Sequence, residues 1–258
     1  MLEQTRSQMS EMKLFGMLKS VDLRMQEAIS QNWGVADFLS ALVTDEKSYR
    51  SAAQISRRLK AASFRTQANF ETLDYTAKRS LTKSLVRDLM QLQYIKARPQ
   101  NLLVVGPTGV GKTFLATAIG NHACRHGHTT IFIGISVFME RLMMARADGT
   151  YLKLRDRLIK TDLLIIDDVG LKKLPGLIVQ DLHDLLEERQ EKCTLITTQL
   201  PLKSWGEIIE DELALDTVVD KLKHGSLNIV IEGESYRKKR NLKPTLDPHT
   251  VPVEIPNL

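Results

Sequence analysis

The fold is decided by the stretch Leu102-Leu-Val-Val-Gly-Pro-Thr-Gly-Val-Gly-Lys-Thr113, near the middle of a chain of 258 residues. Its apolar start predicts a buried strand, and the segment Phe114–His126 directly after it predicts a helix. Gly106 and Gly111 with the following Lys-Thr pair form the pattern of a glycine-rich loop between strand and helix. Such a loop turns several backbone N–H groups toward one anion, and the helix N-terminus adds a positive dipole end. The stretch therefore predicts a phosphate site.

Each part of this loop has a predicted role at a bound nucleoside triphosphate. We expect Lys112 to reach the β- and γ-phosphates and the Thr113 hydroxyl to join the shell of a magnesium ion, so ATP and Mg²⁺ are the predicted cofactors. The residues predicted to bind the nucleotide are Gly106, Pro107, Thr108, Gly109, Val110, Gly111, Lys112, Thr113 and Phe114. The alternative, a glycine-rich turn without a ligand, is disfavoured by the strand and the helix on either side.

A second motif, Leu163-Leu-Ile-Ile-Asp-Asp168, predicts the rest of an ATPase site. Four apolar residues fit a buried parallel strand, and the two carboxylates emerge at its C-terminal end, where ligands bind in open α/β sheets. We expect Asp167 to hold Mg²⁺ through water and Asp168 to orient or polarise the attacking water. The alternative is an acidic strand end that caps the next helix, which the neighbouring phosphate loop disfavours.

A third stretch, Cys193-Thr-Leu-Ile-Thr-Thr-Gln199, places three polar side chains at the end of another strand. A polar side chain at this position can sense the γ-phosphate or position the water, and Thr198 is our candidate for a catalytic role. Taken alone, the stretch fits an ordinary hydroxyl-rich strand end equally well.

Short apolar runs and helix-length segments alternate through the second part of the chain. The predicted strands are Asn101–Val105, Thr129–Ile135, Asp162–Asp167, Cys193–Thr197 and Asn228–Ile231. This order predicts an α/β fold with a mostly parallel sheet and helices on both faces. A helix is predicted over Lys78–Ala97, ending before Pro99, and Phe70–Tyr75 is predicted to be a linker that packs onto the sheet domain.

Residues 1–65 read as helical, because proline is absent and apolar residues such as Leu14, Leu18 and Val21 recur at helical spacing. Four of the eight prolines follow Lys243, which predicts an extended or flexible tail. The predicted domains are therefore a helical domain over 1–68, an ATPase domain over 69–243 and a tail over 244–258.

Positive charge is concentrated before the sheet domain. Residues 47–98 hold 12 basic and 3 acidic residues, which suggests a polyanionic partner, although a solvated helix face explains charge alone slightly better. The DNA contacts predicted on the first basic helix are Arg50, Arg57, Arg58, Lys60 and Arg65. Those predicted in the insertion between the second and third strands are Arg141, Arg146, Lys153, Arg155, Arg157 and Lys160. Contacts of this kind bind phosphate and read little sequence.

Composition excludes several other classes of protein. The chain is 43% hydrophobic and 26% charged, and no apolar run approaches the 18 residues of a membrane span. The first residues are polar, and two cysteines are too few for a disulfide framework or a Cys-rich zinc site. We expect a cytoplasmic protein without a membrane partner. A metabolic P-loop kinase is disfavoured, because a lid with arginines is missing and the basic region would be unexplained.

The motifs together resemble a known family. The order of phosphate loop, Leu-Leu-Ile-Ile-Asp-Asp, Ile-Thr-Thr-Gln and a late segment over 218–240 is similar to the AAA+ ATPases of the DnaC/IstB group. The ending Gly-Glu-Ser-Tyr-Arg-Lys-Lys-Arg and the N-terminal stretches over 38–46 and 57–64 look most like IstB, the helper ATPase of insertion-sequence transposition. The resemblance covers roughly residues 10–243.

This resemblance implies an ATP-dependent homo-oligomer that assembles on double-stranded DNA and recruits and stimulates a cognate transposase. It also implies a P-loop AAA+ core with the phosphate-loop strand central in the sheet and nucleotide sites between neighbouring subunits. In similar initiator-like AAA+ proteins, the insertion between the second and third strands carries extra helices that face a central channel. The alternative within the same group is a DnaC-like helicase loader that binds single-stranded DNA and a replicative helicase.

Three positions define the catalytic expectation within the family. The trans-acting arginine of the family's Asp-Arg-Leu motif is replaced here by Lys221, a point charge without the guanidinium fork. Asp168 stands where many relatives carry the longer glutamate, so we expect slow hydrolysis that assembly stimulates. Arg237, in Gly-Glu-Ser-Tyr-Arg, matches the family's late arginine and is expected to contact nucleotide.

Overall fold

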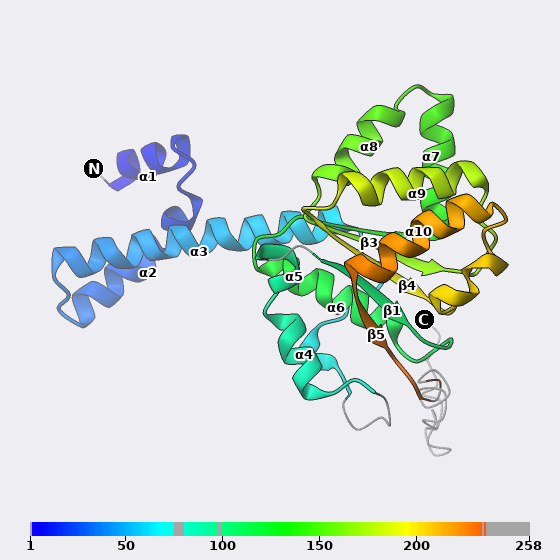
Figure 1. The fold of residues 1–258 in the computed structure, drawn as a ribbon. Helices are drawn as coiled ribbons and strands as arrows, with labels where there is room; N and C mark the ends of the chain where they lie inside the picture. The colour runs from blue at the N-terminus through cyan, green and yellow to red at the C-terminus, as the bar shows by residue number, and fades with distance from the viewer. Residues whose placement is uncertain (1, 75–79, 98–99, 234, 236–258) are drawn as a thin grey trace, which may run out of the picture. The chain divides into compact units, whose positions relative to one another are not determined.

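The structure, a computed structural model, describes residues 2–74, 80–97, 100–233 and 235 (Figure 1). The chain divides into two compact units, with the boundary after Ala61. The sequence had placed this boundary after residue 68. The difference arises because Ala68, Phe70 and Leu73 are buried in the core of the second unit, so the segment between the units belongs to the sheet.

The first unit is helical, as predicted. It consists of α1 (Leu2–Glu11), α2 (Phe15–Ser30) and most of α3 (Val35–Ala62). α2 and α3 approach closely at Gly16, where a Cβ atom would lie 2.6 Å from the Cα atom of Glu46. The buried Glu46 carboxylate accepts hydrogen bonds from the backbone N–H groups of Gly16 (2.6 Å) and Met17 (3.1 Å), and so caps α2.

The second unit contains a parallel five-stranded sheet in the order β2-β3-β4-β1-β5. The strands are β1 (Asn101–Val105), β2 (Thr130–Gly134), β3 (Leu163–Val169), β4 (Cys193–Thr198) and β5 (Ser226–Val230). All five predicted strands are present, and β5 begins two residues earlier than predicted. The phosphate-loop strand β1 lies inside the sheet between β4 and β5, but the middle strand is β4, which corrects the expectation of a central β1.

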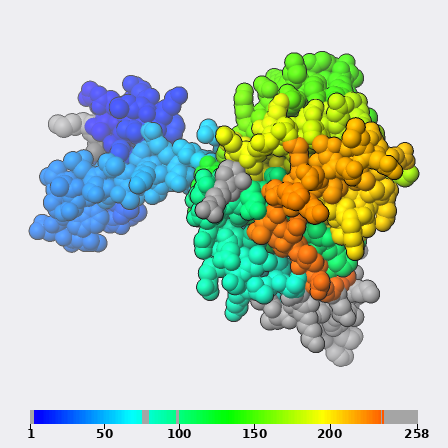
Figure 2. All heavy atoms as spheres, in the orientation of Figure 1, coloured from blue at the N-terminus to red at the C-terminus, as the bar shows by residue number. Residues whose placement is uncertain are grey.

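Helices cover both faces of the sheet, which confirms the predicted α/β architecture. One core lies between the sheet and α6 (Lys112–Arg125), with α4 (Lys83–Met90) and α5 (Gln93–Lys96) beside it. The other core lies under α7 (Ile135–Ala147), α8 (Tyr151–Lys160), α9 (Gly176–Glu188) and α10 (Glu212–Gly225). Figure 2 shows α9 and α10 side by side on the surface of this unit. The short helices η1 (Phe70–Thr72) and η2 (Leu202–Glu207) complete the unit.

The prediction of one continuous helix over Lys78–Ala97 is wrong. Within the described residues this segment is two helices, α4 and α5, because Leu92 adopts a left-handed backbone with φ 56° and is fully buried. The predicted linker includes η1, whose Phe70 packs in the core. Tyr75, Arg237 and the predicted tail over 244–258 lie outside the described residues. Of the helices that the structure describes, none has both the length and the apolar character needed to span a bilayer.

Candidate nucleotide site

The phosphate loop runs from the end of β1 to the start of α6, as predicted. Gly109 and Gly111 adopt φ values of 84° and 104°, a left-handed conformation that glycine tolerates without strain. Gly106 is needed for another reason: a Cβ atom there would lie 2.2 Å from the carbonyl oxygen of Ile231, just after β5. The loop is therefore held between its own helix and the segment that leaves the sheet.

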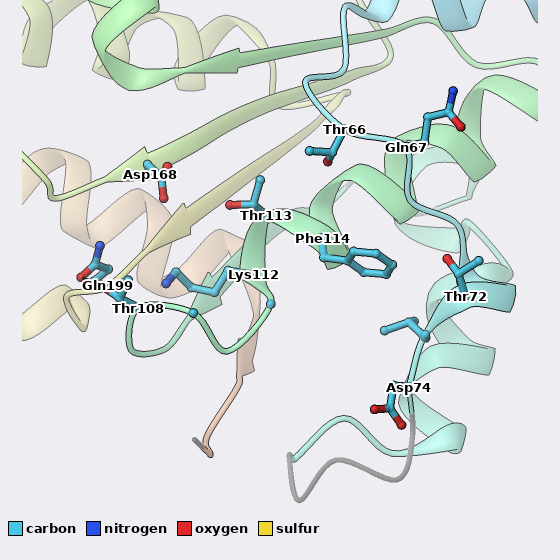
Figure 3. Close-up of a pocket in the computed structure, with 13 residues that line it drawn as sticks. Thr66, Gln67, Thr72, Asp74, Thr108, Lys112, Thr113, Phe114, Asp168 and Gln199 are labelled. Atoms are coloured by element: carbon cyan, nitrogen blue, oxygen red, sulfur yellow. Dashed lines mark hydrogen bonds between the residues drawn. The ribbon is translucent and has the colours of Figure 1, made fainter. Parts of the chain in front are cut away.

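Lys112 is buried at the first position of α6 and turns back onto the loop. Its Nζ atom donates hydrogen bonds to the carbonyl oxygens of Gly106 (2.8 Å) and Pro107 (3.0 Å). Across the loop, the Thr108 hydroxyl donates to Oε1 of Gln199 at 2.7 Å, which ties the loop to the end of β4 (Figure 3). Lys112, the predicted phosphate-binding side chain, thus lies at the loop and lines the cavity beside it.

Asp167, the predicted metal-binding carboxylate, is buried at the end of β3 beside the phosphate loop. Its Oδ1 atom accepts hydrogen bonds from the hydroxyls of Thr197 (2.6 Å) and Thr113 (3.1 Å). Its Oδ2 atom is buried and has no hydrogen-bond partner among the described residues. Burial raises the pKa of Asp167 above its usual value, against the lowering effect of the Thr197 hydrogen bond and the nearby Arg65 charge. A buried carboxylate oxygen without a donor, beside a threonine hydroxyl, fits a hard divalent cation such as Mg²⁺.

Asp168 reaches the cavity because β3 is irregular at this point. The pairing of β3 with β4 shifts register between Ile166 and Val169, and Asp168 has a left-handed φ of 62°. Its backbone N–H donates to the Thr197 hydroxyl at 2.9 Å, which holds the bulge in place. A regular strand would send successive side chains to opposite faces, whereas this bulge turns Asp168 toward the same cavity that Lys112 and Thr113 line.

The cavity has a volume of about 300 Å³ and extends away from the phosphate loop toward a region the sequence did not identify (Figure 3). Phe114 lines it, as predicted. The unpredicted lining residues come from the segment before α4 and are Thr66, Gln67, Thr72, Leu73 and Asp74. The sequence analysis predicted only that the linker over Phe70–Tyr75 packs onto the sheet domain, and it did not predict that these residues line the cavity.

Thr198 does not face this cavity. Its hydroxyl donates to the carbonyl oxygen of Leu200 and accepts from the Leu200 N–H, both at 3.1 Å, so it closes the turn after β4. The side chains at the end of β4 that reach the site are Thr197, bonded to Asp167, and Gln199, which lines the cavity. The structure therefore does not bring the Thr198 side chain to the cavity.

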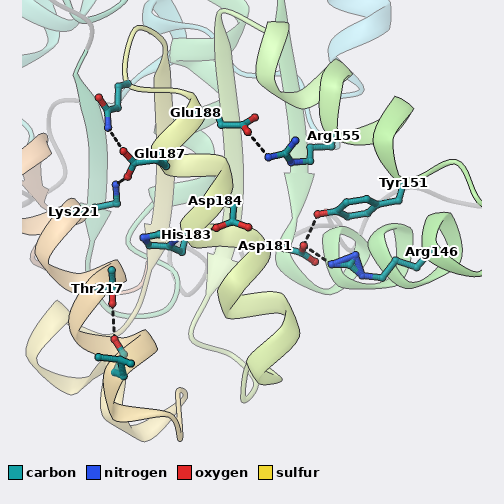
Figure 4. Close-up of polar contacts among 12 residues, drawn as sticks. Arg146, Tyr151, Arg155, Asp181, His183, Asp184, Glu187, Glu188, Thr217 and Lys221 are labelled. Carbon is teal, nitrogen blue, oxygen red and sulfur yellow. Dashed lines mark hydrogen bonds and ion pairs between the residues drawn. The ribbon is translucent and has the colours of Figure 1, made fainter.

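Figure 4 shows Lys221 of α10 paired with Glu187 of α9. Lys221 lies near the amino-terminal ends of the strands. It borders a shallow cleft with Asn101 at the start of β1 and Gly225 just before β5, whereas the phosphate loop follows the end of β1. The five residues of β1 separate its two ends by about 17 Å. Lys221 forms an ion pair with Glu187 of α9, whose Oε1 atom also accepts from Gln190 at 2.6 Å. It cannot contact the nucleotide site of its own chain.

The predicted DNA-contacting cations fall into two groups. Several are exposed side chains, of which Lys160 also pairs with Asp156: Arg57, Lys60, Arg141, Lys153, Arg157 and Lys160. Others have acidic or amide partners in the chain: Arg50 with Glu46, Arg58 with Gln54, Arg146 with Asp181 and Arg155 with Glu188. The prediction that Arg65 belongs to the basic helix is wrong, because α3 ends at Ala62. Arg65 lies in the second unit, beside Gly134. DNA contact by these residues stays a prediction.

Comparison with known proteins gives a consistent result. Residues 7–244 match the family described as IstB-like ATP binding protein. The chain is 35% identical over 240 residues to the insertion sequence ATP-binding protein y4pL of Sinorhizobium fredii, which covers 93% of this chain and 98% of that protein. Among solved structures, it resembles DnaI with a TM-score of 0.55 and 16% identity, over 64% of this chain and 92% of that one. It also resembles the DnaC helicase loader with a TM-score of 0.50 and 25% identity, over 64% and 97% of the two chains. This chain belongs to the IstB-like ATP-binding protein family.

Proposed function

We propose that this chain is the ATPase of an insertion sequence, which forms an ATP-dependent oligomer on duplex DNA and there recruits and stimulates a transposase. The observation that carries the ATPase part is the Asp167 carboxylate, bonded to Thr113 and Thr197 at the mouth of the phosphate loop, with Asp168 turned into the same cavity. Family membership supports the insertion-sequence part.

The chemistry follows from these side chains. Lys112 exchanges its two loop carbonyls for phosphate oxygens, and the loop N–H groups hold the rest of the triphosphate. Thr113 and Asp167 would hold Mg²⁺, which would supply positive charge to the phosphates. Asp168 accepts a hydrogen bond from the attacking water and orients it. Because Asp168 is one methylene shorter than glutamate, hydrolysis is slow until assembly completes the site with Lys221 of a neighbouring subunit.

Similarity over nearly the whole chain supports an insertion-sequence ATPase with a transposase partner over the helicase-loader alternative. The y4pL protein covers 93% of this chain, and the family match begins at residue 7, so both include the helical first unit. The likeness to DnaI and DnaC covers 92% and 97% of those two chains, so these structures do not test the first unit. The exposed cations Arg57 and Lys60 of α3 supply the first unit with a phosphate-binding surface.

The nucleotide site is tested by calorimetric titration with a non-hydrolysable ATP analogue and Mg²⁺. Lys112→Ala should abolish binding, because the loop then lacks the cation that meets the β- and γ-phosphates. Lys96→Ala, an exposed lysine at the end of α5, is the matched control and should bind as the wild type does. Equal binding by Lys112→Ala would mean that the phosphate loop is misassigned.

The DNA partner is tested by sedimentation of the protein with duplex or single-stranded DNA, with and without the analogue. We expect larger assemblies on duplex DNA only when the analogue is present. Replacing Arg57 and Arg58 together with alanine should reduce the slope of log affinity against log salt by up to about 2, one unit for each lost phosphate contact. Preference for single strands without assembly on duplex DNA would favour the helicase-loader function instead.

A further inference from the structure

Arg65 occupies a place in the second unit that the sequence did not indicate. The preceding Phe64 packs in the core on the α6 side of the sheet, with its ring 6.0 Å from that of Phe132. Gly120 of α6 makes room for this ring, since a Cβ atom there would lie 2.7 Å from Cε1 of Phe64. The backbone that carries Arg65 is thus anchored over the end of β2.

A second glycine makes room for the Arg65 guanidinium. A Cβ atom on Gly134, the last residue of β2, would lie 2.5 Å from Nη2 and 3.1 Å from Cζ of Arg65. Gly134 has an ordinary extended backbone, with φ −74° and ψ 146°, so glycine is not required there by conformation. What glycine provides at this position is space for the cation.

The guanidinium lies on the same face of the sheet as the metal-binding carboxylate. Gly134 pairs directly with Asp167 in the β2–β3 ladder, and parallel neighbours in register point to the same face. That face is the α6 side, because Phe132 and Ile165, two residues earlier in each strand, belong to the core beneath α6. The Arg65 charge acts on Asp167 and lowers its pKa against the rise caused by burial.

We propose that Arg65 is a residue of the nucleotide site that contacts the terminal phosphate of ATP from within the same chain, and so distinguishes ATP from ADP. This inference rests on the proposed ATPase function. Asp167 is one hydrogen bond away from Thr113, which follows the lysine that meets the β- and γ-phosphates. A cation beside Asp167 is therefore placed at the γ-phosphate end of the site. No hydrogen bond or ion pair engages the Arg65 guanidinium among the described residues, so it is available to an anion.

The test compares affinity for a non-hydrolysable ATP analogue with affinity for ADP, each with Mg²⁺. Arg65→Ala should weaken analogue binding by about tenfold or more, the contribution of a hydrogen bond to a charged group, and change ADP binding by less than about twofold. Arg65→Lys should lose less, because it keeps the charge but not the fork. Arg87→Ala, an exposed arginine of α4, is the charge-matched control and should leave both affinities unchanged.

Gly134→Ala gives a second test that leaves Arg65 itself intact. The added methyl group displaces the guanidinium, which sits at the far end of a flexible side chain, without straining the backbone. This variant should therefore lose analogue affinity in the same direction as Arg65→Ala while keeping its ADP affinity.

The outcomes separate the inference from the function on which it rests. If the wild type binds both nucleotides and Lys112→Ala binds neither, the nucleotide site stands. An analogue-to-ADP affinity ratio that Arg65→Ala leaves unchanged then overturns the inference alone. If Arg65→Ala instead lowers the salt slope of DNA binding with the ratio unchanged, Arg65 is a DNA contact, as the sequence predicted. A wild-type protein that binds no nucleotide overturns both.

Discussion

Arg189 shows how one buried side chain supports the site from a distance. It is 1% exposed, and its guanidinium donates to the carbonyl oxygens of Leu158, Thr161 and Cys193 and to the hydroxyl of Thr194. These groups lie at the end of α8 and the start of β4, so one cation joins the insertion helices to the sheet. Burial lowers its pKa to about 10, which leaves it charged at neutral pH.

We predict that Arg189→Ala lowers the free energy of unfolding of the second unit by about 3 kcal/mol or more, because several buried acceptors lose their donor together. Arg189→Lys should fall between this variant and the wild type, since one ammonium cannot reach all these acceptors. Chemical denaturation measures the change, with the exposed neighbour Glu191→Ala as a control expected within about 0.5 kcal/mol of the wild type. A loss below 1 kcal/mol for Arg189→Ala would contradict the structural role.

Local pattern predicted the residues of the site better than their orientation. The phosphate loop, Asp167 and Asp168 were identified because each stands at a fixed distance from a strand end. The choice between Thr197 and Thr198 could not be made, because β4 is buried on both faces and its alternation carries no signal. Arg65 was assigned to a basic helix because its true neighbour, Gly134, is distant in the sequence.

An ion pair between Arg24 and Asp45 joins α2 to α3 in the first unit. Nε and Nη2 of Arg24 donate to the two carboxylate oxygens of Asp45, both at 2.8 Å. This bidentate contact, helped by Ser20, lowers the pKa of Asp45 from 3.8 to about 2. A carboxyl group whose pKa is lowered by folding stabilises the folded state above its unfolded pKa, and this contribution is lost as pH falls through the folded pKa.

The pH dependence of this helix pair follows with a definite sign. We predict that amide hydrogen exchange in α2 and α3, measured relative to the intrinsic exchange rate at the same pH, becomes faster as pH falls from about 4 to 2. Asp45→Asn should make exchange faster at neutral pH and remove most of this acid-dependent part. Asp37→Asn, which removes an exposed carboxyl in the first turn of α3, is the control and should keep the wild-type pH course. Identical pH courses for the wild type and Asp45→Asn would exclude the proposed linkage.

The predicted elements differ from the observed ones where distant packing overrides local pattern. The five strands were found because each is a short apolar run between turn signals. The break between α4 and α5 was missed because the left-handed Leu92 carries no glycine or proline to mark it, and only its burial in the sheet core accounts for it. The first-unit helices were predicted correctly because helical spacing is a local signal.

The two ends of the parallel strands carry different functional groups. Asp168 and the phosphate loop lie at the carboxyl ends of the strands, and Lys221 lies near their amino-terminal ends, paired with Glu187. A residue at the amino-terminal ends of the strands can act only on the nucleotide of a neighbouring subunit. Repeated head-to-tail contacts of this kind build a ring or a helical filament. In the proposed oligomer Lys221 would exchange Glu187 for the neighbour's phosphate, so we expect assembly and hydrolysis to be linked.

This arrangement predicts complementation between two defective subunits. Asp168→Asn keeps nucleotide binding but loses the group that orients water, and Lys221→Ala keeps a complete phosphate loop but lacks the trans-acting cation. Each variant alone should hydrolyse ATP near the basal rate on duplex DNA. In a 1:1 mixture about a quarter of the interfaces join an intact Asp168 to an intact Lys221, so about a quarter of the wild-type rate should return. Steady-state phosphate release measures this, and a mixture that gives only the mean of the two variants would show that Lys221 does not act between subunits.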